Sequence, residues 1–557
     1  MNNLKYEQPN IESDTKEYER LLVELNSAKS AEEQLKIIEE INAIRDNFFS
    51  MYWLSYINYL LDVNSDFWNE QENFFAKNDP IMNNLKLKYY AVLNNSEFKD
   101  ELKSVIGDKV FRIAKLEVSL LSDEIIEDRI KEKELRNAYS KIIGSAKIKF
   151  REEELTLKQL SKYLSSLDRE ERIEASQKAT EFFESVEEEI DNILDRLIKI
   201  RNNMARNLGF KSYTDMSYVE MRRLDYGRSE IESFRNQIVK YVVPFVGKLK
   251  ELQKESLGLD KLKYYDEGVL FKDGNQTPKG DTKWIVEQAS KMYKEISPKL
   301  HYLFRKMVDE NLMDLDSRQG KSSIGITTYI PNHKVPIFIS SFNGTAGNIA
   351  TLTHEFGHSF QLYSSKDLKY YENWWPTFDT CEIHGESMNL LTLPYAKLFF
   401  DEDHQKYTYA NLLGTLSNLC YISLIDEFQH AIYDEENLSI EGRKTRFREL
   451  EKKYMPWVDF EANDYLEKGN GWQKIDHIFS TPFYFIDHAL GKAVALQFYA
   501  QVIENPNETW NKYIDFCALG GRYSFVESIE SIGFKNPFEK DLIKDLVQKV
   551  EKETTKI

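Results

Sequence analysis

Residues 354–358 read His-Glu-Phe-Gly-His, and the spacing of these two histidines is the first feature of the chain that could do chemistry. On a helix, positions i and i+4 lie on one face about one turn apart. His354 and His358 could therefore direct ring nitrogens at one Zn²⁺ ion. Glu355, about 100° around the helix, could reach a metal-bound water without binding the metal. A chance match is expected only about 0.01–0.02 times in a chain of this composition.

A catalytic zinc of this kind needs a third protein ligand and an open fourth position. The downstream candidates are four carboxylates, Glu372, Asp379, Glu382 and Glu386. The sequence from 378 onward is typical of a second helix, and we favour Glu382 as the ligand. Glu386, one turn later on the same face, is the alternative ligand or a group that orients a ligand histidine, and Asp379 is a second orienting candidate. His384 points away from the face of Glu382 and is not counted as a ligand.

The elements that must position these residues follow from the placement of glycine and proline. Residues 10–79 contain neither, and residues 81–243 contain no proline and only four glycines. In strand-rich folds, turn residues recur about every 8–12 positions because the strands are short. These stretches contain too few turn residues for such a fold. Ile37, Ile41 and Ile44 recur at helical spacing. The first 240 residues are therefore predicted to be almost entirely helical.

Turn residues crowd together only between about 318 and 347. Two β-type runs lie there, 324–330 and 335–340, and residues 331–334 form the turn between them. Pro336 cannot donate a hydrogen bond to a sheet, so the second strand is predicted to be an edge strand. The helical pattern resumes after 347. The chain as a whole is predicted to be mainly α, with a small β-sheet next to the helix of residues 354–358.

Composition excludes several classes of function. Lys and Arg number 74 against 92 Asp and Glu, which gives a net charge of −18. This balance argues against nucleic-acid binding and against docking on anionic lipid. Three cysteines without a CxxC pair favour a reducing, cytoplasmic setting. No apolar run is long enough to span a membrane, and the N-terminus lacks the pattern of a secretory signal.

The run 329–360, which includes Thr353-His-Glu-Phe-Gly-His-Ser359, resembles the thimet oligopeptidase and oligoendopeptidase F family of zinc metallopeptidases. It is most similar to the bacterial oligoendopeptidase F and Pz-peptidase branch. Three further stretches fit, 208–226, 382–388 and 476–488, so the resemblance covers about 200 to 530.

The resemblance implies a two-lobed helical body with a deep central channel that holds one zinc ion per chain. It implies cleavage of internal bonds in short peptides and assigns the third zinc ligand to Glu382. We expect an N-terminal helical lobe at 1–165 and the catalytic domain at 166–557.

The stretch 476–488 resembles the family segment whose His and Tyr contact the substrate. Ser480-Thr-Pro482 predicts a helix start, with His477 in the loop before it and Tyr484 in its first turn. Both side chains are suitable donors to a developing oxyanion, and we assign them that role. His488 is interpreted as a core or surface histidine. The same structural interpretation applies to the remaining unpaired histidines, His301, His333, His404 and His430.

The sequence therefore predicts a zinc endopeptidase in which Glu355 moves the proton and the peptide is added as a strand along 335–341. One alternative is a carboxypeptidase or dipeptidyl carboxypeptidase on a similar body. Another is a metal-stabilised peptide-binding protein without turnover, although a structural zinc site would not need Glu355.

Overall fold

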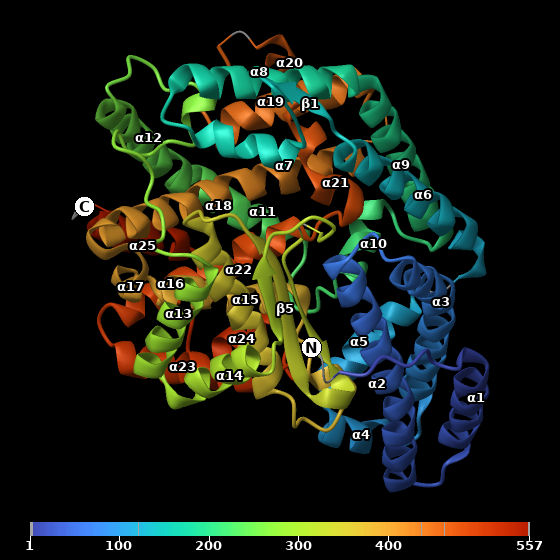
Figure 1. The fold of residues 1–557 in the computed structure, drawn as a ribbon. Helices are drawn as coiled ribbons and strands as arrows, with labels where there is room; N and C mark the ends of the chain where they lie inside the picture. The colour runs from blue at the N-terminus through green and yellow to red at the C-terminus, as the bar shows by residue number, and fades with distance from the viewer. Residues whose placement is uncertain (1–3, 121, 323, 436, 462, 555–557) are drawn as a thin grey trace.

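The computed structural model describes residues 4–554 apart from 121, 323, 436 and 462. Helices make up most of this part of the chain, as Figure 1 shows. The prediction of a mainly α fold is confirmed, whereas the central channel and the lobe boundary at 165 stay predictions. Within the described residues, no helix combines the length and the apolar character that crossing a membrane requires.

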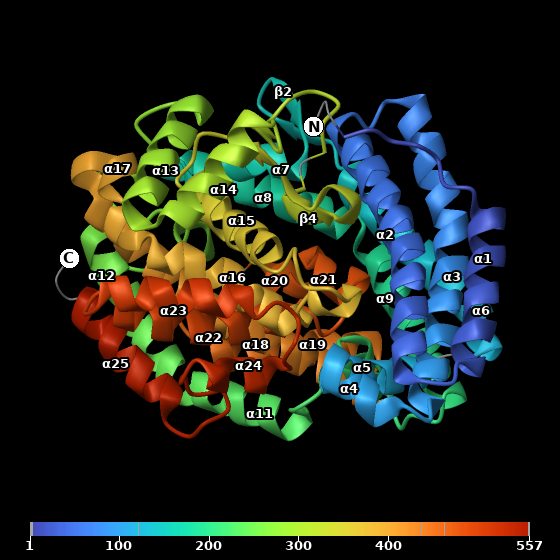
Figure 2. The ribbon, with the colours of Figure 1, turned by 90° about the horizontal axis from the view of Figure 1, so that it is seen from below.

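The first five helices lie together on one side of the molecule (Figures 1 and 2). They are α1 (Ile11–Ser27), α2 (Ala31–Leu61), α3 (Asp66–Asn95), α4 (Lys99–Ile106) and α5 (Asp108–Val118). The side chains of Asn10, Ser30 and Ser65 accept hydrogen bonds from backbone N–H groups in the first turns of α1, α2 and α3. Such polar caps satisfy donors that have no partner inside the helix, which explains why these helices begin where they do.

The middle of the chain is also helical but contains one short hairpin. Its elements are α6 (Ile126–Gly144), β1 (Ile148–Phe150), β2 (Glu153–Leu155), α7 (Leu157–Leu160), α8 (Arg169–Ser185), α9 (Glu187–Asn207), α10 (Tyr213–Glu220), α11 (Arg228–Gln237), α12 (Val243–Leu257), α13 (Thr282–Ile296) and α14 (Pro298–Asp309). The antiparallel β1–β2 pair departs from the predicted helical character of the first 240 residues. Its turn uses Arg151 at φ 54°, a conformation that usually calls for glycine, so glycine placement gave no signal there.

A three-stranded sheet follows, formed by β3 (Met313–Asp316), β4 (Ile326–Ile330) and β5 (Val335–Phe342). The β4–β5 hairpin confirms the two predicted strands and their turn. The prediction that the second strand is an edge is wrong, because β5 lies between β3 and β4. Proline is tolerated in this central strand because the pairing of β3 with β5 begins at Phe338, beyond Pro336.

The C-terminal half is helical again. Its helices are α15 (Gly347–Ser364), α16 (Phe378–Leu391), α17 (Lys397–Phe400), α18 (His404–Asp434), α19 (Ile440–Tyr454), α20 (Asp464–Glu467), α21 (Asp476–Ser480), α22 (Phe485–Val502), α23 (Pro506–Ala518), α24 (Phe525–Ser531) and α25 (Leu542–Thr554).

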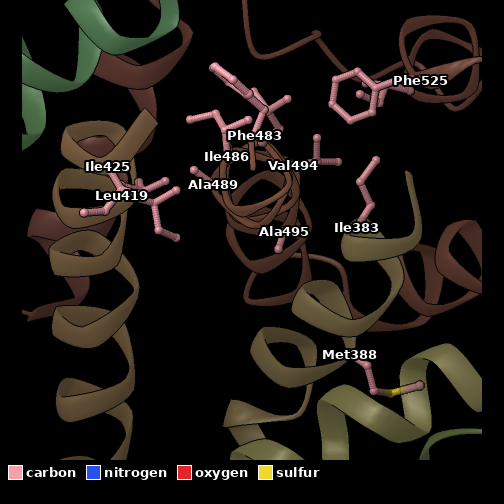
Figure 3. Close-up of a cluster of buried hydrophobic side chains, with 14 of the residues drawn as sticks. Ile383, Met388, Leu419, Ile425, Phe483, Ile486, Ala489, Val494, Ala495 and Phe525 are labelled. Carbon is pink, nitrogen blue, oxygen red and sulfur yellow. The ribbon is translucent and has the colours of Figure 1, made fainter. Parts of the chain in front are cut away.

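Helix α22 runs through the core of this half and is buried on nearly all sides. Figure 3 shows side chains of α22, among them Ile486 and Val494, between Leu419 and Ile425 of α18 on one side and Ile383 of α16 on the other. A helix that is apolar all round is typical of such a position. Because α22 packs tightly against α16, it fixes the element that carries the predicted third metal ligand.

Candidate active site

Helix α15 is anchored at its start by a side chain and along one face by the core. The Oδ1 atom of Asn348 accepts hydrogen bonds from the backbone N–H groups of Asn343, Gly344 and Thr345, which folds the loop after β5 into the helix. Phe356 is fully buried against aromatic rings of α13 and α14. With Phe356 facing the core, His354 and His358 face α16.

The two histidines and Glu382 converge on one point. The Nε2 atoms of His354 and His358 are 3.0 Å apart, and Nε2 of His354 lies 3.6 Å from Oε2 of Glu382. One ligand atom from each residue lies within 4.8 Å of the others. The Oε2 atom of Glu382 is buried beside this point, and its one close polar neighbour outside the group, among the described residues, is Nδ1 of His488 at 2.8 Å. Two imidazole nitrogens and one such carboxylate oxygen fit the donor set of a catalytic zinc site.

Burial and neighbouring charge shape the ionisation of these ligands. Burial lowers the pKa of His358, and the adjacent His354 lowers it further. Burial alone would raise the pKa of Glu382, but the imidazoles of His488, His358 and His354 outweigh it and hold the pKa well below its usual value. A neutral imidazole and an ionised carboxylate are the forms that bind a metal.

Two glycines allow α15 and α16 to approach closely enough for this convergence. A Cβ at Gly357 would lie 2.5 Å from the carbonyl oxygen of His384, and a Cβ at Gly385 would lie 2.7 Å from Cε1 of His354. A third close contact lies behind them, where a Cβ at Gly491 of α22 would be 2.8 Å from the carbonyl carbon of Glu382. The three glycines thus fit α15, α16 and α22 against one another at the ligands.

Glu355 lies beside the ligand group but is not part of it. The hydroxyl of Thr327 in β4 donates to Oε2 of Glu355 at 2.7 Å and to the backbone oxygen of the same residue at 3.2 Å. The sheet therefore holds the carboxylate that the sequence predicts as the general base. Sequence reasoning did not identify Thr327, because the contact joins residues that are 28 positions apart.

Glu386 lies close to His354 but outside the ligand group. Its Oε1 is 3.9 Å from Nδ1 of His354 and 2.6 Å from Nζ of Lys492. Burial would raise the pKa of Glu386, but Lys492 outweighs it and lowers that pKa to about 2. Glu382, Glu386 and His488 form a second group that meets the same geometric criterion for a metal. The ammonium of Lys492 already neutralises Glu386, which disfavours a second cation there.

The segment 476–488 differs from its prediction in local structure. The long helix α22 begins at Phe485 with Tyr484 as its N-cap, so Ser480-Thr-Pro482 does not start it. His477 lies inside the short helix α21 rather than in a loop. The rings of His477 and Tyr484 are stacked with centroids 5.8 Å apart. The two residues are therefore neighbours, although the structure places His477 in a helix and Tyr484 before α22 instead of in the predicted loop and first turn.

The hydroxyl of Tyr484 donates to Oε1 of Glu382 at 2.6 Å, which directs it at a predicted metal ligand. Burial raises the pKa of Tyr484, and the charge of Glu382 raises it further, so the hydroxyl stays protonated and able to donate. Burial lowers the pKa of His477, which favours its neutral form.

The interpretation of His488 as a core or surface histidine is wrong. Its Nδ1 lies 2.8 Å from Oε2 of Glu382 and 3.7 Å from Oε1 of Glu386. Burial would lower the pKa of His488, but the two carboxylates outweigh it and raise that pKa to about 10. A spacing of four residues from Tyr484 at the start of a helix was the signal that could have found it.

Two buried arginines and a glutamine hold the turn between α21 and α22. Arg201 donates to the carbonyl oxygens of Ile478 and Phe479, and Arg223 donates to the carbonyl oxygen of Phe483. The N–H of Phe483 donates to Oε1 of Gln429 at 2.9 Å. These contacts maintain Phe483 at φ 65°, a conformation that bulky residues rarely adopt, and so direct Tyr484 toward Glu382.

Other candidates lie outside the ligand group. Asp379 accepts a hydrogen bond from the hydroxyl of Tyr226 at 2.7 Å, and Glu372 forms a 2.6 Å ion pair with Arg45. His384, which the sequence analysis did not count as a ligand, is buried and stacks on Phe516 of α23. None of the remaining four histidines belongs to a metal-binding group within the described chain: His301, His333, His404 and His430.

Comparison with known proteins places this arrangement among peptidases. A family model described as peptidase family M3 matches residues 162–548, and a model of the peptidase M3 N-terminal domain matches residues 1–121. The oligoendopeptidase F homolog of Borreliella burgdorferi is 24% identical over 471 residues, which cover 80% of this chain and 75% of that protein. Oligopeptidase PepF of Bacillus subtilis is 23% identical over 380 residues, which cover 63% of this chain and 55% of that protein.

Solved structures match over the whole length. A structure of Pz peptidase A with an inhibitor is 40% identical with a TM-score of 0.96, and the match covers 100% of this chain and 99% of that one. A putative oligoendopeptidase F from Bacillus anthracis is 38% identical with a TM-score of 0.91, covering 100% and 98% of the two chains.

Proposed function

This chain belongs to peptidase family M3, and we propose that it is a zinc-dependent oligoendopeptidase that hydrolyses internal bonds of short, unstructured peptides. The observation that carries the proposal is the convergence of His354, His358 and Glu382, with Glu355 beside them and not among them. A structural zinc site has no use for such a carboxylate, whereas hydrolysis needs one. The related proteins are named as oligoendopeptidases, oligopeptidases and a Pz peptidase, which supports the same activity and the preference for short peptides.

We assign the metal to His354, His358 and Glu382, one ion per chain. The chemistry that zinc supplies when bound by such a set is Lewis-acid activation of a water and of a carbonyl group. Glu355, oriented by the hydroxyl of Thr327, takes the proton from the attacking water and passes it to the leaving amine. This role requires a carboxylate that lies beside the metal ligands without being one of them, and Glu355 lies outside the group formed by His354, His358 and Glu382.

The residues of 477–488 complete the proposed machinery. His477 donates to the developing oxyanion, the role that the sequence predicted for it. Tyr484 holds Oε1 of Glu382 in the free enzyme, so we assign it first to positioning the ligand and second to donating to the oxyanion. His488 holds the other carboxylate oxygen, which makes it a further positioning residue.

The sequence analysis placed the peptide along residues 335–341. Because these residues form the central strand β5, we now propose that the peptide pairs with the edge strand β4. Thr327 of β4 contacts Glu355, so a peptide paired with this edge would pass the proposed general base. Pairing with backbone holds the main chain of the substrate and leaves side-chain selectivity broad. An inhibitor-bound structure in which the peptide pairs with another element would contradict this path.

We also propose that the enzyme works in a reducing, cytoplasmic setting without nucleic-acid or membrane partners. Its three cysteines, Cys381, Cys420 and Cys517, are all free thiols. The net charge of −18 disfavours anionic surfaces.

The test is mass-spectrometric mapping of cuts in a peptide of about a dozen residues blocked at both ends, with chelator and then with added Zn²⁺. We expect internal cuts that vanish with chelator and return with zinc. Glu355→Gln should keep the metal and lose about 10²–10⁴-fold in rate, whereas Glu402→Gln, at an exposed remote site, should match the parent enzyme.

Trimming that occurs only after the C-terminus is unblocked would favour the carboxypeptidase alternative. A metal-loaded protein that cuts neither peptide would favour the binding protein. A fully active Glu355→Gln enzyme would reject the general-base role.

A further inference from the structure

Phe378 is an exposed aromatic side chain at the first position of α16, the helix that carries Glu382. Its exposed fraction is 42%, and Phe67 is the only other phenylalanine with an exposed side chain in the part of the chain that the structure describes. A single exposed apolar residue is common on protein surfaces and indicates no function by itself. The two phenylalanines differ in their surroundings. Phe67 lies in α3 among the N-terminal helices (Figure 1), where its ring contacts Tyr6 and Trp68, whereas Phe378 lies four residues before a proposed metal ligand.

The ring of Phe378 is connected to the proposed metal centre through one residue. It meets the ring of Tyr484 nearly edge-on, with centroids 5.8 Å apart and planes at 80°. The hydroxyl of Tyr484 in turn donates to Oε1 of Glu382 at 2.6 Å. Positions four apart on a helix share a face, so Phe378 lies on the same side of α16 as Glu382. The exposed part of the Phe378 ring therefore lies beside the place where the proposed enzyme cuts its substrate.

Two further rings continue this surface. His477 stacks on Tyr484, and Phe485 stacks on His477 with centroids 4.5 Å apart. The side chains of Tyr484, His477 and Phe485 are half-buried, so each presents part of its surface to solvent. Burial favours the neutral form of His477, because it lowers the pKa of the imidazole. A row of uncharged rings suits an apolar, preferably aromatic side chain, which gains both from burial and from edge-to-face ring contacts.

We propose that Phe378 is a specificity-determining residue that packs against one bulky apolar, preferably aromatic, side chain of the peptide. The inference rests on the proposed function and names the side chain that its site favours. Only Tyr484 separates Phe378 from Glu382, so the favoured side chain should lie within about three residues of the cleaved bond, at about 3.3 Å per residue of extended peptide. The rest of the substrate is held by its main chain, so this position adds one preference to an otherwise broad selectivity.

The experiment uses short peptides of alanine, glycine and serine, blocked at both ends, in which a single phenylalanine is moved along the chain. Mass spectrometry maps the cut in each peptide. In the parent enzyme, we expect the cut to follow the phenylalanine at a constant offset, because a ring that packs on Phe378 fixes the register of the peptide. In Phe378→Ala, the offset should be lost. The ratio of kcat/KM between a phenylalanine peptide and its alanine counterpart should fall about 3–10-fold, the range for one aromatic contact.

Phe67→Ala is the matched control, because it also removes an exposed ring from the start of a helix. This variant should keep both the offset and the ratio of kcat/KM. Phe378→Tyr, which restores an aromatic ring, should keep the offset as well. Competition with a chromogenic chelator should give Phe378→Ala the zinc affinity of the parent, since the ring contacts the substrate and not a metal ligand.

Three results would overturn the proposal. The first is a cut at no fixed distance from the phenylalanine in the parent enzyme. The second is a constant offset that survives in folded, zinc-loaded Phe378→Ala. The third is a loss of zinc affinity in Phe378→Ala together with an equal loss of kcat on every peptide, which would show that the ring only holds Tyr484 in place.

A binding measurement separates this proposal from the proposed function. The same peptides are titrated by calorimetry into zinc-loaded Glu355→Gln enzyme, with and without the additional change Phe378→Ala. The additional change should weaken binding of the phenylalanine peptide about 3–10-fold relative to its alanine counterpart, and equal weakening of both peptides would count against the subsite. If the parent enzyme cut none of the peptides, the proposed function would fail, and this comparison would still decide the role of Phe378.

Discussion

Replacing Gly385 by alanine tests whether the close approach of α15 and α16 builds the metal site. The new Cβ would lie 2.7 Å from Cε1 and 2.8 Å from both ring nitrogens of His354, whereas ordinary contact begins at 3.4 Å. The ring or the helix must therefore move by about 0.7 Å, the difference between these distances, because the packed core offers little room. Metal–ligand distances tolerate only about 0.2 Å.

We expect Gly385→Ala to weaken zinc binding by at least about 100-fold, a loss at the upper end of what displaced supporting groups cause. Overpacking costs about 1–3 kcal/mol, and alanine in a helix returns about 0.5–1 kcal/mol, so the free energy of unfolding of the apoenzyme should fall by about 1–2 kcal/mol. Competition with a chromogenic chelator measures the affinity, and urea unfolding of the metal-free protein measures the stability.

Gly414→Ala is the matched control. Gly414 lies inside α18, and a Cβ there would meet nothing within 4 Å. This variant should keep the zinc affinity and gain up to about 1 kcal/mol of stability from helix propensity. A Gly385→Ala enzyme with the zinc affinity and turnover of the parent would show that His354 can shift without loss of the metal site, and that the close approach of α15 and α16 is not required for it.

Three further predictions concern a ligand contact, a buried carboxyl group and the metal itself. Tyr484→Phe removes the hydroxyl that holds Glu382 and should weaken zinc binding about 10–100-fold in chelator competition; an unchanged affinity would show that the hydrogen bond does not position the ligand. Burial raises the pKa of Glu451 to about 7 from an ordinary 4.5, so the folded state binds the extra proton and stability should fall by about 3 kcal/mol as pH rises from 4.5 to 7. Glu451→Gln should flatten this part of the urea-unfolding pH profile, and parallel profiles would contradict the assignment. Removing zinc should abolish cleavage and lower the Tm, because an ion at about 1,000 times its Kd stabilises the folded state by about 4 kcal/mol. A Tm that changes neither with chelator nor with added zinc would argue against a bound metal.

The sequence predicted the features that depend on local patterns. The i, i+4 histidines, the helix that carries Glu382 and the β4–β5 hairpin all follow from periodicity and turn residues close in the chain. The place of β5 in the sheet does not, because it depends on parallel pairing with Met313–Asp316, a short run with a weak strand signal.

The local structure of residues 480–488 could not be predicted from the sequence either. A Ser-Thr-Pro run usually starts a helix, but here distant groups, Arg223 and Gln429, bind the backbone of Phe483 and impose a turn. That turn moves the helix start to Phe485 and brings His488 to Glu382. Long-range hydrogen bonds of this kind are set by tertiary packing, which local propensity does not record.

The N-terminal helices take part in the same construction. Arg45 of α2 forms a buried 2.6 Å ion pair with Glu372, in the loop that joins α15 to α16. Lys109 of α5 lies 3.4 Å from the backbone oxygens of Glu372 and Trp375 in that loop. Since α15 carries the two histidines and α16 carries Glu382, the loop fixes how the ligands meet. The buried Arg45–Glu372 pair attaches the loop to the N-terminal helices, and the desolvation of these two charges is offset only while both partners are present. The loop between α15 and α16 therefore depends on residues 263 to 327 positions away in sequence, and we expect the proposed metal site to form only when the N-terminal helices are folded with these two helices.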